Sequence, residues 1–390
     1  MKDKQALGMA DNRQIFIVAG EASGEAHAAR LVSALKQQAP HVYIGGIGGD
    51  AMRAAGADIV RDFAELAVMG LFEVLKRYPR IKAIFNETVS RLKRDKPDML
   101  ILVDYPGFNL KLAKQAKKLG IPVLYYISPK VWAWRAGRVK QIRQTVDHMA
   151  VLFPFEVPIY EQAGVPVTCV GHPLVDAVNS ELDNAAAKSK FKLDPRHRVI
   201  GLFPGSRRSE IDALLPVMLA AAERIQHRHF DVSVVLPLAA GIELDYIRQF
   251  TDNSRLPVQV VQGDFYDLIK ACDAIVAASG TVTLEIALLG TPHLIAYKVS
   301  PWSYRILKRL VKIPYVGLCN IVTGKPLITE LLQDDVTEVR LDQLLTDLMT
   351  HPQSQQRADN IRQQVRSALG PAGGADNAAK LVLQMLSENN

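Results

Sequence analysis

Cysteine is scarce in this sequence, because only Cys169, Cys272 and Cys319 occur among its 390 residues. Their spacings match neither a metal site nor a redox pair. Buried thiols in a reducing compartment account for them, so the sequence predicts no disulfide and no cysteine-based metal centre. An Asp-x-Asp motif is also absent. We therefore expect no metal carried on such a motif, and no cofactor.

Long apolar segments are missing as well. No stretch reaches the roughly 18 consecutive apolar residues that a membrane-spanning helix requires. The polar residues Met1–Arg13 have mixed charge and lack the apolar core of a secretory signal. These two absences predict a cytoplasmic protein.

The net charge narrows the partners only slightly. A formal charge of +7 would suit nucleic acid, a membrane surface or phosphorylated substrates. The sequence contains no recognisable nucleic-acid module and no basic residues interleaved with aromatics, so nucleic acid is not expected.

Short β-branched runs alternate with amphipathic stretches along the whole chain, which is typical of parallel sheets wrapped by helices. The length suits two domains. We expect an α/β protein with two Rossmann-like, doubly wound domains facing a central cleft, where the carboxyl ends of both sheets bind ligands. The expected boundaries are residues 11–178 for the first domain, 179–198 for a polar linker, 199–350 for the second domain and 351–390 for C-terminal helices.

The expected elements follow the apolar runs. The strands are predicted at Gln14–Ala19, Val42–Gly46, Met99–Val103, Pro122–Ile127, His148–Leu152, Val167–Val170, Val199–Phe203, Val232–Pro237, Val258–Val261, Ala274–Ala277 and His293–Tyr297. Helices are predicted at Glu25–Gln38, Leu71–Asp95 with a break at Pro79, Leu110–Leu119 and Arg138–Val146. The C-terminal helices could cross back to the first domain or exchange with a partner chain in a homodimer.

Two loops of the second half are suited to phosphate. In the first loop, Gly205 allows close approach of the backbone, Ser206 follows it, and Arg207 supplies a forked cation suited to a diphosphate. Ser209 is expected to cap the following helix, with Asp212 three residues on. The alternative is an ordinary turn with exposed arginines.

The second loop contains Ser279, Gly280 and Thr281 before a helix, where amides and hydroxyls can meet an anion. Glu285, one turn into that helix, could accept hydrogen bonds from both hydroxyls of a ribose. It could instead only complement the helix dipole. Two such loops on one sheet favour a nucleoside diphosphate.

In the first half, Asp104 ends the apolar strand Met99–Val103, which is a suitable place for a general base. Its alternative role is to cap the next helix, although Asn109 would serve better as that cap. The loop Gly20–Glu25 has two glycines, but its carboxylates make it a poor phosphate site. We expect Glu21 and Ser23 to bind sugar hydroxyls there.

A loop rich in tryptophan follows the predicted strand Pro122–Ile127. Its aromatic rings could stack on sugars or line acyl grooves, and its arginine could meet a phosphate, although core packing is the alternative for one ring. The residues concerned are Ser128, Trp132, Trp134 and Arg135. His172, which follows the last strand of this half, could contact the donor phosphate or could be a structural histidine.

The segment around residues 68–82 begins as an apolar helix and continues with cations. This pattern predicts a contact with a membrane surface. The alternative is a buried helix with a solvated end. The apolar residues are Val68, Met69, Leu71, Phe72 and Leu75, and the cations are Lys76, Arg77, Arg80 and Lys82. Arg305, Lys308, Arg309 and Lys312 could extend this surface.

Taken together, these loops resemble those of the lipid-A-disaccharide synthase family, a family of B-type glycosyltransferases. The similar segments run in order from residue 20 to about residue 332, and Ser-Pro-x-Val-Trp-Ala-Trp-Arg is the most specific of them. They are Gly20–Gly24, Ala67–Leu75, Val103–Asn109, Ser128–Arg135, Phe153–Glu156, Gly171–Asp176, Pro204–Arg207, Ser279–Glu285 and Tyr315–Asn320.

The resemblance implies an inverting enzyme of lipid A (lipopolysaccharide) biosynthesis, peripheral at the inner membrane of a Gram-negative bacterium. It would join UDP-diacylglucosamine to the 6-hydroxyl of diacylglucosamine 1-phosphate and release UDP. The resemblance assigns the base to Asp104. It assigns UDP contacts to Ser206, Arg207, Ser279, Gly280, Thr281, Glu285 and Asn320. Two departures from the family, Glu25 and Lys130, concern the detail of acceptor binding.

Two other readings share this architecture. A UDP-sugar epimerase would need neither an acceptor nor an acyl groove, which the tryptophan loop and the apolar patch argue against. A non-catalytic nucleotide-sugar binding protein would not need Asp104.

Overall fold

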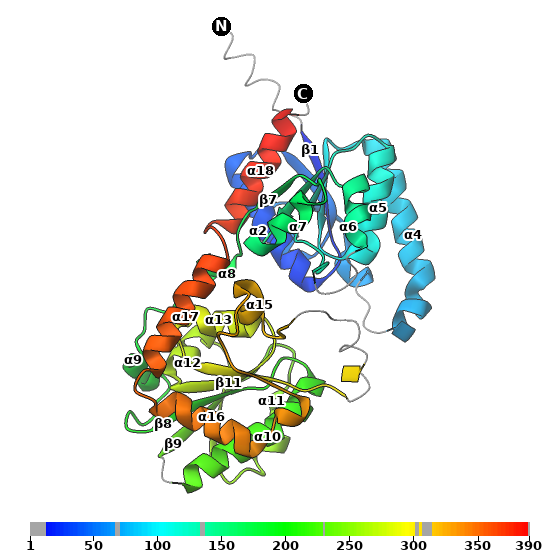
Figure 1. Ribbon diagram of the computed structural model, residues 1–390. Coiled ribbons are helices and arrows are strands. Elements are labelled where there is room, and N and C mark those ends of the chain that lie inside the picture. Colours follow the sequence, from blue (N-terminus) through cyan, green and yellow to red (C-terminus); the bar gives the residue numbers. More distant parts are fainter. Residues whose placement is uncertain are drawn as a thin grey trace. The chain divides into compact units, whose positions relative to one another are not determined.

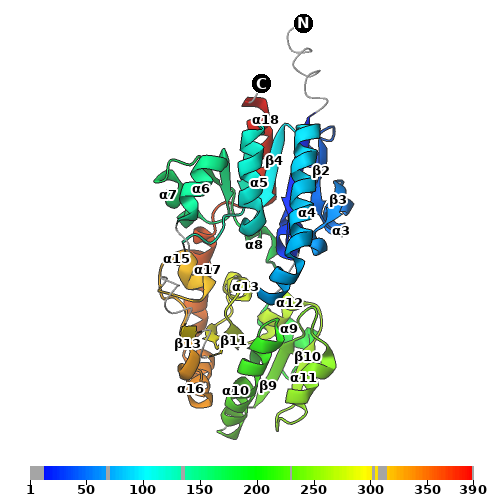
Figure 2. The ribbon, with the colours of Figure 1, turned by 90° about the vertical axis from the view of Figure 1, so that its right-hand side faces the viewer.

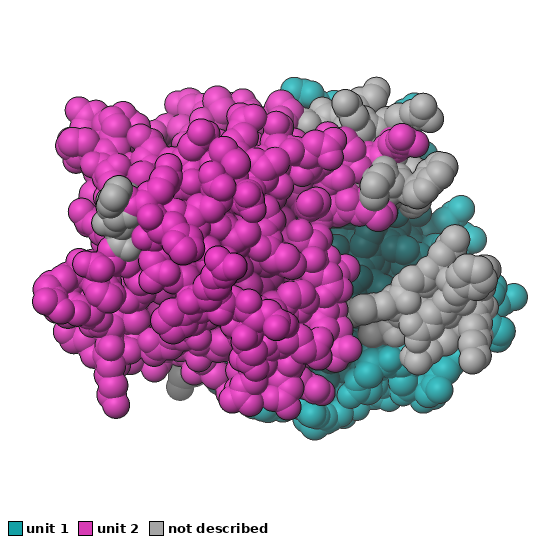
Figure 3. Space-filling view, turned by 90° about the horizontal axis from the view of Figure 1, so that it is seen from below, with its two compact units in different colours: residues 1–173, 370–390 teal, residues 174–369 magenta. Residues whose placement is uncertain are grey.

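The computed structural model describes residues 13–66, 71–132, 137–228, 231–300, 304–305 and 314–388, and leaves out the side chains of 71–77. The chain divides into two compact units (Figure 3). Unit 1 comprises Met1–Pro173 and Gly370–Asn390, and unit 2 comprises Leu174–Leu369.

Unit 1 is built on a parallel sheet of seven strands in the order β3-β2-β1-β4-β5-β6-β7. The strands are β1 Gln14–Ala19, β2 Tyr43–Gly48, β3 Asp58–Asp62, β4 Met99–Val103, β5 Val123–Tyr126, β6 His148–Val151 and β7 Val167–Cys169. All five residues of the central strand β4 are fully buried, because helices cover both faces of the sheet.

The helices of unit 1 form two layers on this sheet. One core contains residues of α2 (Ala22–Gln38), α3 (Asp50–Ala54) and α18 (Gly374–Glu388). The opposite core contains residues of α4 (Leu71–Asp95), α5 (Pro106–Lys118), α6 (Arg138–Thr145) and α7 (Val157–Glu161). Figure 2 shows α4 and α5 side by side along this second face. The strand order reverses between β1 and β4, so their carboxyl ends form the switch point where such sheets bind ligands.

Unit 2 repeats this plan with six parallel strands in the order β10-β9-β8-β11-β12-β13. The strands are β8 Arg198–Phe203, β9 Val232–Pro237, β10 Val258–Val261, β11 Ala274–Ala278, β12 His293–Tyr297 and β13 Glu330–Leu332. The covering helices include α10 (Arg208–His227), α11 (Leu244–Thr251) and α16 (Glu338–Thr350) on one face. The other face carries α9 (Asn184–Lys190), α12 (Phe265–Ala271) and α13 (Thr281–Leu289). Its switch point lies between β8 and β11.

The predicted α/β class with two parallel sheets is confirmed. Strands β1, β4, β9, β10 and β12 have the predicted bounds. Strands β3 and β13 were not predicted. Both lie at sheet edges, β3 contains three charged residues among its five, and β13 is only three residues long.

Three local predictions were wrong. Helix α4 continues through Pro79 without a break. Helix α5 begins at Pro106, because proline at the first helical position already has the required φ, so Asn109 is not the cap. Helix α10 begins at Arg208, so Ser209 is not its cap.

The polar segment 179–198 was expected to be a linker, and it lies within unit 2. Asp183 caps α9 by accepting a hydrogen bond from the Ala186 amide. The nearly buried Lys188 ammonium pairs with Asp273 at 2.8 Å, which fixes α9 to the amino end of β11.

The C-terminal segment returns to unit 1 after α17 (Ser354–Ala368). Helix α18 packs against α2 of the same chain, and Figure 1 shows the two helices together. The backbone approach at this return is close, since a Cβ on Gly171 would lie 2.0 Å from the Pro371 oxygen. Within the described part of the chain, every helix is too short or too polar to cross a bilayer.

Candidate active site

Asp104 lies directly after β4, at the switch point of the unit 1 sheet. Both Asp104 and Tyr105 have φ of 45°, in the left-handed region that is unfavourable for residues other than glycine. The Asp104 backbone is fixed on both sides. Its amide donates to the Tyr126 oxygen at 3.0 Å, and its oxygen accepts from Tyr125 Oη at 2.6 Å and Asn109 Nδ2 at 2.8 Å. The surroundings therefore hold a strained backbone at this position.

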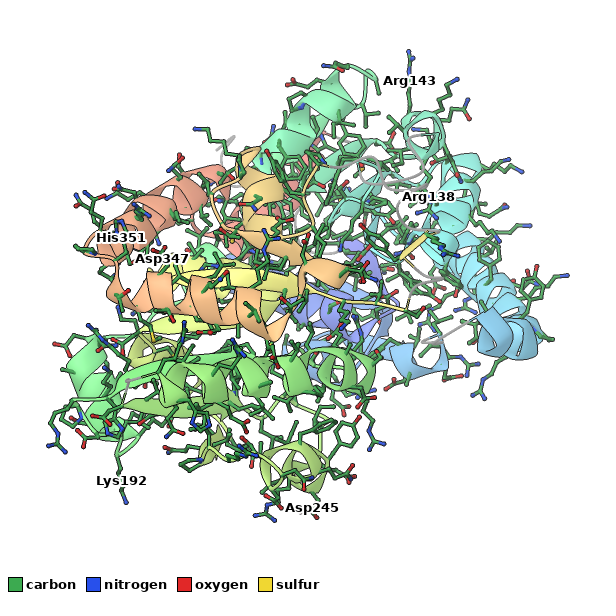
Figure 4. The ribbon with its side chains drawn as sticks, turned by 60° about the horizontal axis from the view of Figure 1, so that its bottom comes forward. Arg138, Arg143, Lys192, Asp245, Asp347 and His351 are labelled. Carbon is green, nitrogen blue, oxygen red and sulfur yellow. The ribbon has the colours of Figure 1, made fainter. Side chains whose placement is uncertain are left out.

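The Asp104 carboxyl has an unusual charge environment. Burial and the nearby Glu21 carboxylate raise its pKa from 3.8 to about 6, while Lys130 and Arg138 act in the opposite direction. At neutral pH most of these carboxyls are ionised, yet they hold a proton more tightly than an exposed aspartate would. This is the property of a general base. Figure 4 labels Arg138 on α6.

The loop after β1 fits closely against this strained turn. A Cβ on Gly20 would lie 2.2 Å from Cδ1 of Tyr105, so only glycine allows the tyrosine ring to lie there. The Tyr105 hydroxyl donates to the Leu66 oxygen at 2.8 Å. The first glycine of the loop is thus required by packing beside Asp104.

The two carboxylates of this loop have different surroundings. Glu21 is exposed, as is the predicted sugar-binding residue Ser23. Glu25 is buried and accepts a hydrogen bond from the Met52 amide at 2.8 Å, near the start of α3. Glu25 therefore has a structural role, and Glu21 is the carboxylate that remains accessible.

Beyond β5, the tryptophan loop is anchored to a buried carboxyl that the sequence analysis gave no role. Glu156 is only 3% exposed, and it accepts hydrogen bonds from Trp132 Nε1 at 3.2 Å and from the Phe153 amide at 3.3 Å. Burial raises the Glu156 pKa to about 7. The Ser128 hydroxyl lies 2.7 Å from the Tyr160 hydroxyl. The signal for Glu156 was a single carboxylate within the apolar run Phe153–Pro158.

His172 follows β7 and is buried. Its ring stacks on Phe153 with centroids 5.0 Å apart. Burial, followed by the charges of His27 and Arg30, lowers the His172 pKa to about 4. The imidazole is therefore neutral at physiological pH.

In unit 2, the loop after β8 carries Gly205 with φ of 111°, and both Ser206 and Arg207 are exposed. The expected free amides are already engaged. One Glu210 oxygen accepts from the Ser206 amide at 3.1 Å and from the Arg207 amide at 3.3 Å, and the other pairs with the Arg207 guanidinium at 2.8 Å. An anion would have to replace this carboxylate.

The loop after β11 lies on the adjacent strand. Ser279 Oγ donates to the Val316 oxygen at 2.9 Å, and the exposed Thr281 begins α13 after Gly280. Glu285 is half-buried and accepts a hydrogen bond from Tyr266 Oη at 3.2 Å. Burial raises the pKa of Glu285.

Asn320 lies in α15 (Leu318–Thr323) and is only 1% exposed. Its Nδ2 donates to the Ile328 oxygen and to Glu330 Oε1, both at 2.7 Å. Glu330 also accepts from the amides of Val316 and Gly317. Glu330, which the sequence analysis missed, thus joins β13 to the loop that contacts Ser279.

Within each unit, the predicted residues gather at the carboxyl edge of the sheet. In unit 1 they follow β1, β4, β5 and β7. In unit 2 they follow the neighbouring strands β8 and β11, except for Asn320, which lies in α15 between β12 and β13. Other predicted residues lie outside the described part of the structure, namely Val68, Met69, Trp134 and Arg135, as do the side chains of Leu71, Phe72 and Leu75. Among the described residues, no three His, Cys, Asp or Glu side chains gather as a metal site would require.

The sequence as a whole matches a known family model over residues 15–383, and that model describes lipid-A-disaccharide synthetase. The chain belongs to the lipid-A-disaccharide synthase family. A lipid-A-disaccharide synthase from Trichlorobacter lovleyi is 47% identical over 97% of this chain and 98% of its own length. Relatives of the same name from Nitrosococcus oceani and Coxiella burnetii are 47% and 41% identical, each over 96% of this chain and 97% and 99% of their own lengths.

Solved structures with the same fold are more distant in sequence. The UDP-GlcNAc 2-epimerase of Neisseria meningitidis, bound to UDP-GlcNAc, has a TM-score of 0.57 at 14% identity and covers 97% of this chain and 99% of its own. The calicheamicin glycosyltransferase CalG4 has the same TM-score and identity, over 96% and 98% of the two chains. These likenesses concern the fold alone.

Membership of the lipid-A-disaccharide synthase family decides between the readings of the sequence. The chain is a glycosyltransferase, and the similarity to epimerases reflects their common fold. The non-catalytic reading is set aside on the same ground.

Proposed function

We propose that this enzyme transfers a diacylated glucosamine from UDP to the 6-hydroxyl of diacylglucosamine 1-phosphate. The acceptor oxygen forms a bond to the anomeric carbon of the donor while the bond from that carbon to the UDP oxygen breaks. UDP leaves with the electron pair, and the hydroxyl proton passes to the enzyme. Attack opposite the leaving group inverts the anomeric centre and gives a β-linked disaccharide.

Asp104 would receive that proton, and its environment is the observation that carries the proposal. A desolvated carboxylate with a pKa of about 6 takes up a proton more readily than an ordinary aspartate, and it remains ionised at neutral pH. Its strained position after β4 presents it at the ligand-binding edge of the sheet.

Unit 2 would bind the leaving UDP. Negative charge grows on the diphosphate as the bond breaks, and the Arg207 guanidinium with the amides of Ser206 and Arg207 would stabilise it. The diphosphate would displace the Glu210 carboxylate that holds these groups in the free enzyme. Ser279, Gly280 and Thr281 would contact the nucleotide from the adjacent loop, and Glu285 would accept hydrogen bonds from the ribose.

The acceptor would lie against unit 1. Glu21 and Ser23 are exposed beside Asp104 and would bind sugar hydroxyls. The loop fixed by Glu156 would supply the aromatic and cationic groups, which are Trp132, Trp134 and Arg135, with Ser128 at its base.

Acylated substrates reside in a bilayer, so the enzyme would act as a peripheral protein at the cytoplasmic face of the inner membrane. The contact would be the start of α4 with the preceding residues Val68 and Met69. The next described part of α4 supports this, because Tyr78 is 53% exposed and Arg80 is also exposed, an aromatic and a cation suited to an interface.

Liposome flotation tests this contact. Leu71→Glu combined with Phe72→Glu should reduce binding to anionic vesicles while the melting temperature stays unchanged, and Glu87→Gln on the same helix serves as a control. Unchanged flotation of the double variant would assign this segment to the core instead.

The reaction itself is tested by incubating the enzyme with both substrates in detergent micelles. We expect one UDP for each disaccharide 1-phosphate, with a β linkage in the NMR spectrum. Conversion of the donor to an epimer, or release of UDP without disaccharide, would refute the proposed function.

A further inference from the structure

Among the described residues, three buried polar atoms at the carboxyl edge of unit 1 have no hydrogen-bond partner. One is Oδ1 of Asn109, whose Nδ2 is already bonded to the Val103 and Asp104 oxygens. The other two are His27 Nδ1 on α2 and the hydroxyl of Tyr126, the last residue of β5. The two rings meet edge to face with centroids 6.5 Å apart. Burying such groups without partners costs free energy, so these neighbouring rings are suited to a ligand that would satisfy both polar atoms.

These atoms lie next to the proposed base. Tyr126 is the register partner of Val103, the residue before Asp104, and its backbone oxygen accepts the Asp104 amide hydrogen bond. Tyr126 belongs to the core that α2 covers. A ligand bound to His27 and Tyr126 would therefore be adjacent to Asp104 within the same unit.

The cation nearest in sequence to His27 is Arg30. Arg30 is exposed on α2, one helical turn after His27, and its charge alters the pKa of His27, Tyr126 and His172 alike. Residues three apart on a helix lie on the same face, so Arg30 and His27 are neighbours on α2. None of the described residues forms an ion pair with Arg30, although many surface arginines of this chain are paired.

The protonation states suit an anion. Burial and Arg30 hold the pKa of His27 at about 4, so its ring is neutral at pH 7 and one ring nitrogen donates. Burial raises the pKa of Tyr126 to about 12, so the phenol keeps its proton. Two neutral donors beside a guanidinium provide hydrogen bonds and charge for a phosphate.

We propose that His27, Tyr126 and Arg30 form a subsite for the phosphate of a sugar phosphate. This inference rests on the proposed function, in which the acceptor is a hexosamine 1-phosphate. With its phosphate held here, the acceptor sugar lies beside Asp104, and the subsite selects phosphorylated acceptors over neutral ones.

Steady-state kinetics with two acceptors tests the selection. Arg30→Gln and His27→Asn should each raise KM for the phosphorylated acceptor by about 10- to 100-fold, the range for one bond to a charged group. KM for the UDP-sugar should not change. With the acceptor that lacks the phosphate, the variants and the parent enzyme should have similar kcat/KM.

Two matched variants serve as controls. Arg143→Gln removes an equal charge from an exposed position on α6, labelled in Figure 4, and should change neither KM. Lys130→Gln removes a cation that acts on Asp104. If Lys130→Gln abolishes the preference for the phosphorylated acceptor and Arg30→Gln does not, the phosphate binds on the other side of Asp104 and the proposal is overturned.

Tyr126→Phe distinguishes a ligand-binding role of the Tyr126 hydroxyl from a structural one. Removing an unpaired buried hydroxyl should leave the melting temperature of the free enzyme unchanged or higher, while KM for the phosphorylated acceptor rises. A lower melting temperature with an unchanged KM would mean that a water molecule satisfies this hydroxyl and that no ligand binds there.

Direct binding needs no turnover, so it remains decisive even if the proposed reaction fails. The histidine ring NMR signals of the full-length enzyme are followed during titration with glucosamine 1-phosphate, inorganic phosphate and glucosamine, and the signal lost in His27→Asn identifies His27. Both phosphates should shift the His27 signal, and Arg30→Gln should abolish the shift. No shift, or an equal shift with glucosamine, would disprove the subsite.

Discussion

The carboxyl edges of the two sheets share one topology but differ in how their polar groups are satisfied. In unit 1 the strained residues Asp104 and Tyr105 follow β4, and two carboxyls, those of Asp104 and Glu156, have pKa values of about 6 and 7. Within the described part of the chain, the buried Nδ1 of His27 and the hydroxyl of Tyr126 have no hydrogen-bond partner there.

In unit 2 the loop after β8 obtains its left-handed turn from Gly205, at no steric cost. Its backbone amides are bound by Glu210, and Glu330 binds the amides that precede α15. The difference matches the proposed roles. A general base benefits from a desolvated setting that brings its pKa toward the working pH, whereas a nucleotide site benefits from donors already held in place.

The largest expected effect is that of Asp104→Asn. Loss of the base should lower kcat by about two to four orders of magnitude, while UDP binding by calorimetry stays unchanged. Asp50→Asn, which alters an exposed carboxylate of the same unit, should retain full activity. Near-normal turnover of Asp104→Asn would remove this residue from the role of base.

The same variant should be more stable than the parent enzyme at pH 8. The folded pKa of Asp104, about 6, lies above its ordinary value of 3.8, so the contribution of this group to stability falls as the pH rises through that window. The variant carries no charge there, so its melting temperature should exceed that of the parent at pH 8 and approach it at pH 4. A lower melting temperature at pH 8 would contradict the strained, desolvated description of this edge.

The proposed nucleotide site of unit 2 is tested at the loop after β8. Arg207→Gln removes a charge-assisted contact and should weaken UDP binding by about 10- to 100-fold. Glu210→Gln should act in the opposite direction, because a neutral amide competes less well with the diphosphate for the Ser206 and Arg207 amides. Calorimetric titration with UDP measures both, and weaker binding by Glu210→Gln would show that this carboxylate supports the loop more than it competes.

Glu156 tests whether the tryptophan loop depends on one buried carboxyl. Glu156→Ala leaves the Trp132 indole N–H and the Phe153 amide without acceptors and should cost about 1–3 kcal/mol of stability. Glu156→Gln keeps one acceptor oxygen and should cost less. Tryptophan fluorescence and urea unfolding measure the effect, with Glu161→Gln on the exposed part of α7 as the control. Equal stability of both Glu156 variants and the parent would mean that the loop is held by other contacts.

The sequence was sufficient for features that depend on long apolar runs. Strand β4 is apolar throughout, and a carboxylate directly after such a strand must lie at the sheet edge, so Asp104 could be located without coordinates. The glycine-containing loops after β8 and β11 could be located by the same logic. Edge strands β3 and β13 could not, because a strand with one free edge needs little apolar sequence.

The acceptors of the loop amides were beyond sequence reasoning. Glu210 and Glu330 look like ordinary surface residues in the sequence, and Glu156 stands out only as a single carboxylate in an apolar run. The roles of all three depend on which backbone amides come within reach after folding. The pair His27 and Tyr126 depends on how α2 packs on the sheet, which no local pattern encodes. Pro79 led to the opposite error, because a break was predicted there and helix α4 continues through it. Tertiary packing can stabilise a helix that contains a proline.

The smallest effect we expect is a shift in the acid limb of the pH–rate profile. This shift tests the carboxyl edge of the unit 1 sheet most directly, because Asp104 lies there. For the parent enzyme, kcat/KM should fall as the pH drops through about 6, because Asp104 becomes protonated. Glu21 raises this pKa and Lys130 lowers it, with Arg138 acting in the same direction as Lys130. Glu21→Gln should therefore move the limb to lower pH and Lys130→Gln to higher pH. Opposite shifts from two surface substitutions would identify the titrating group as Asp104, whereas shifts of the same sign would assign the limb to another group, of which Glu156 with its pKa of about 7 is the nearest candidate.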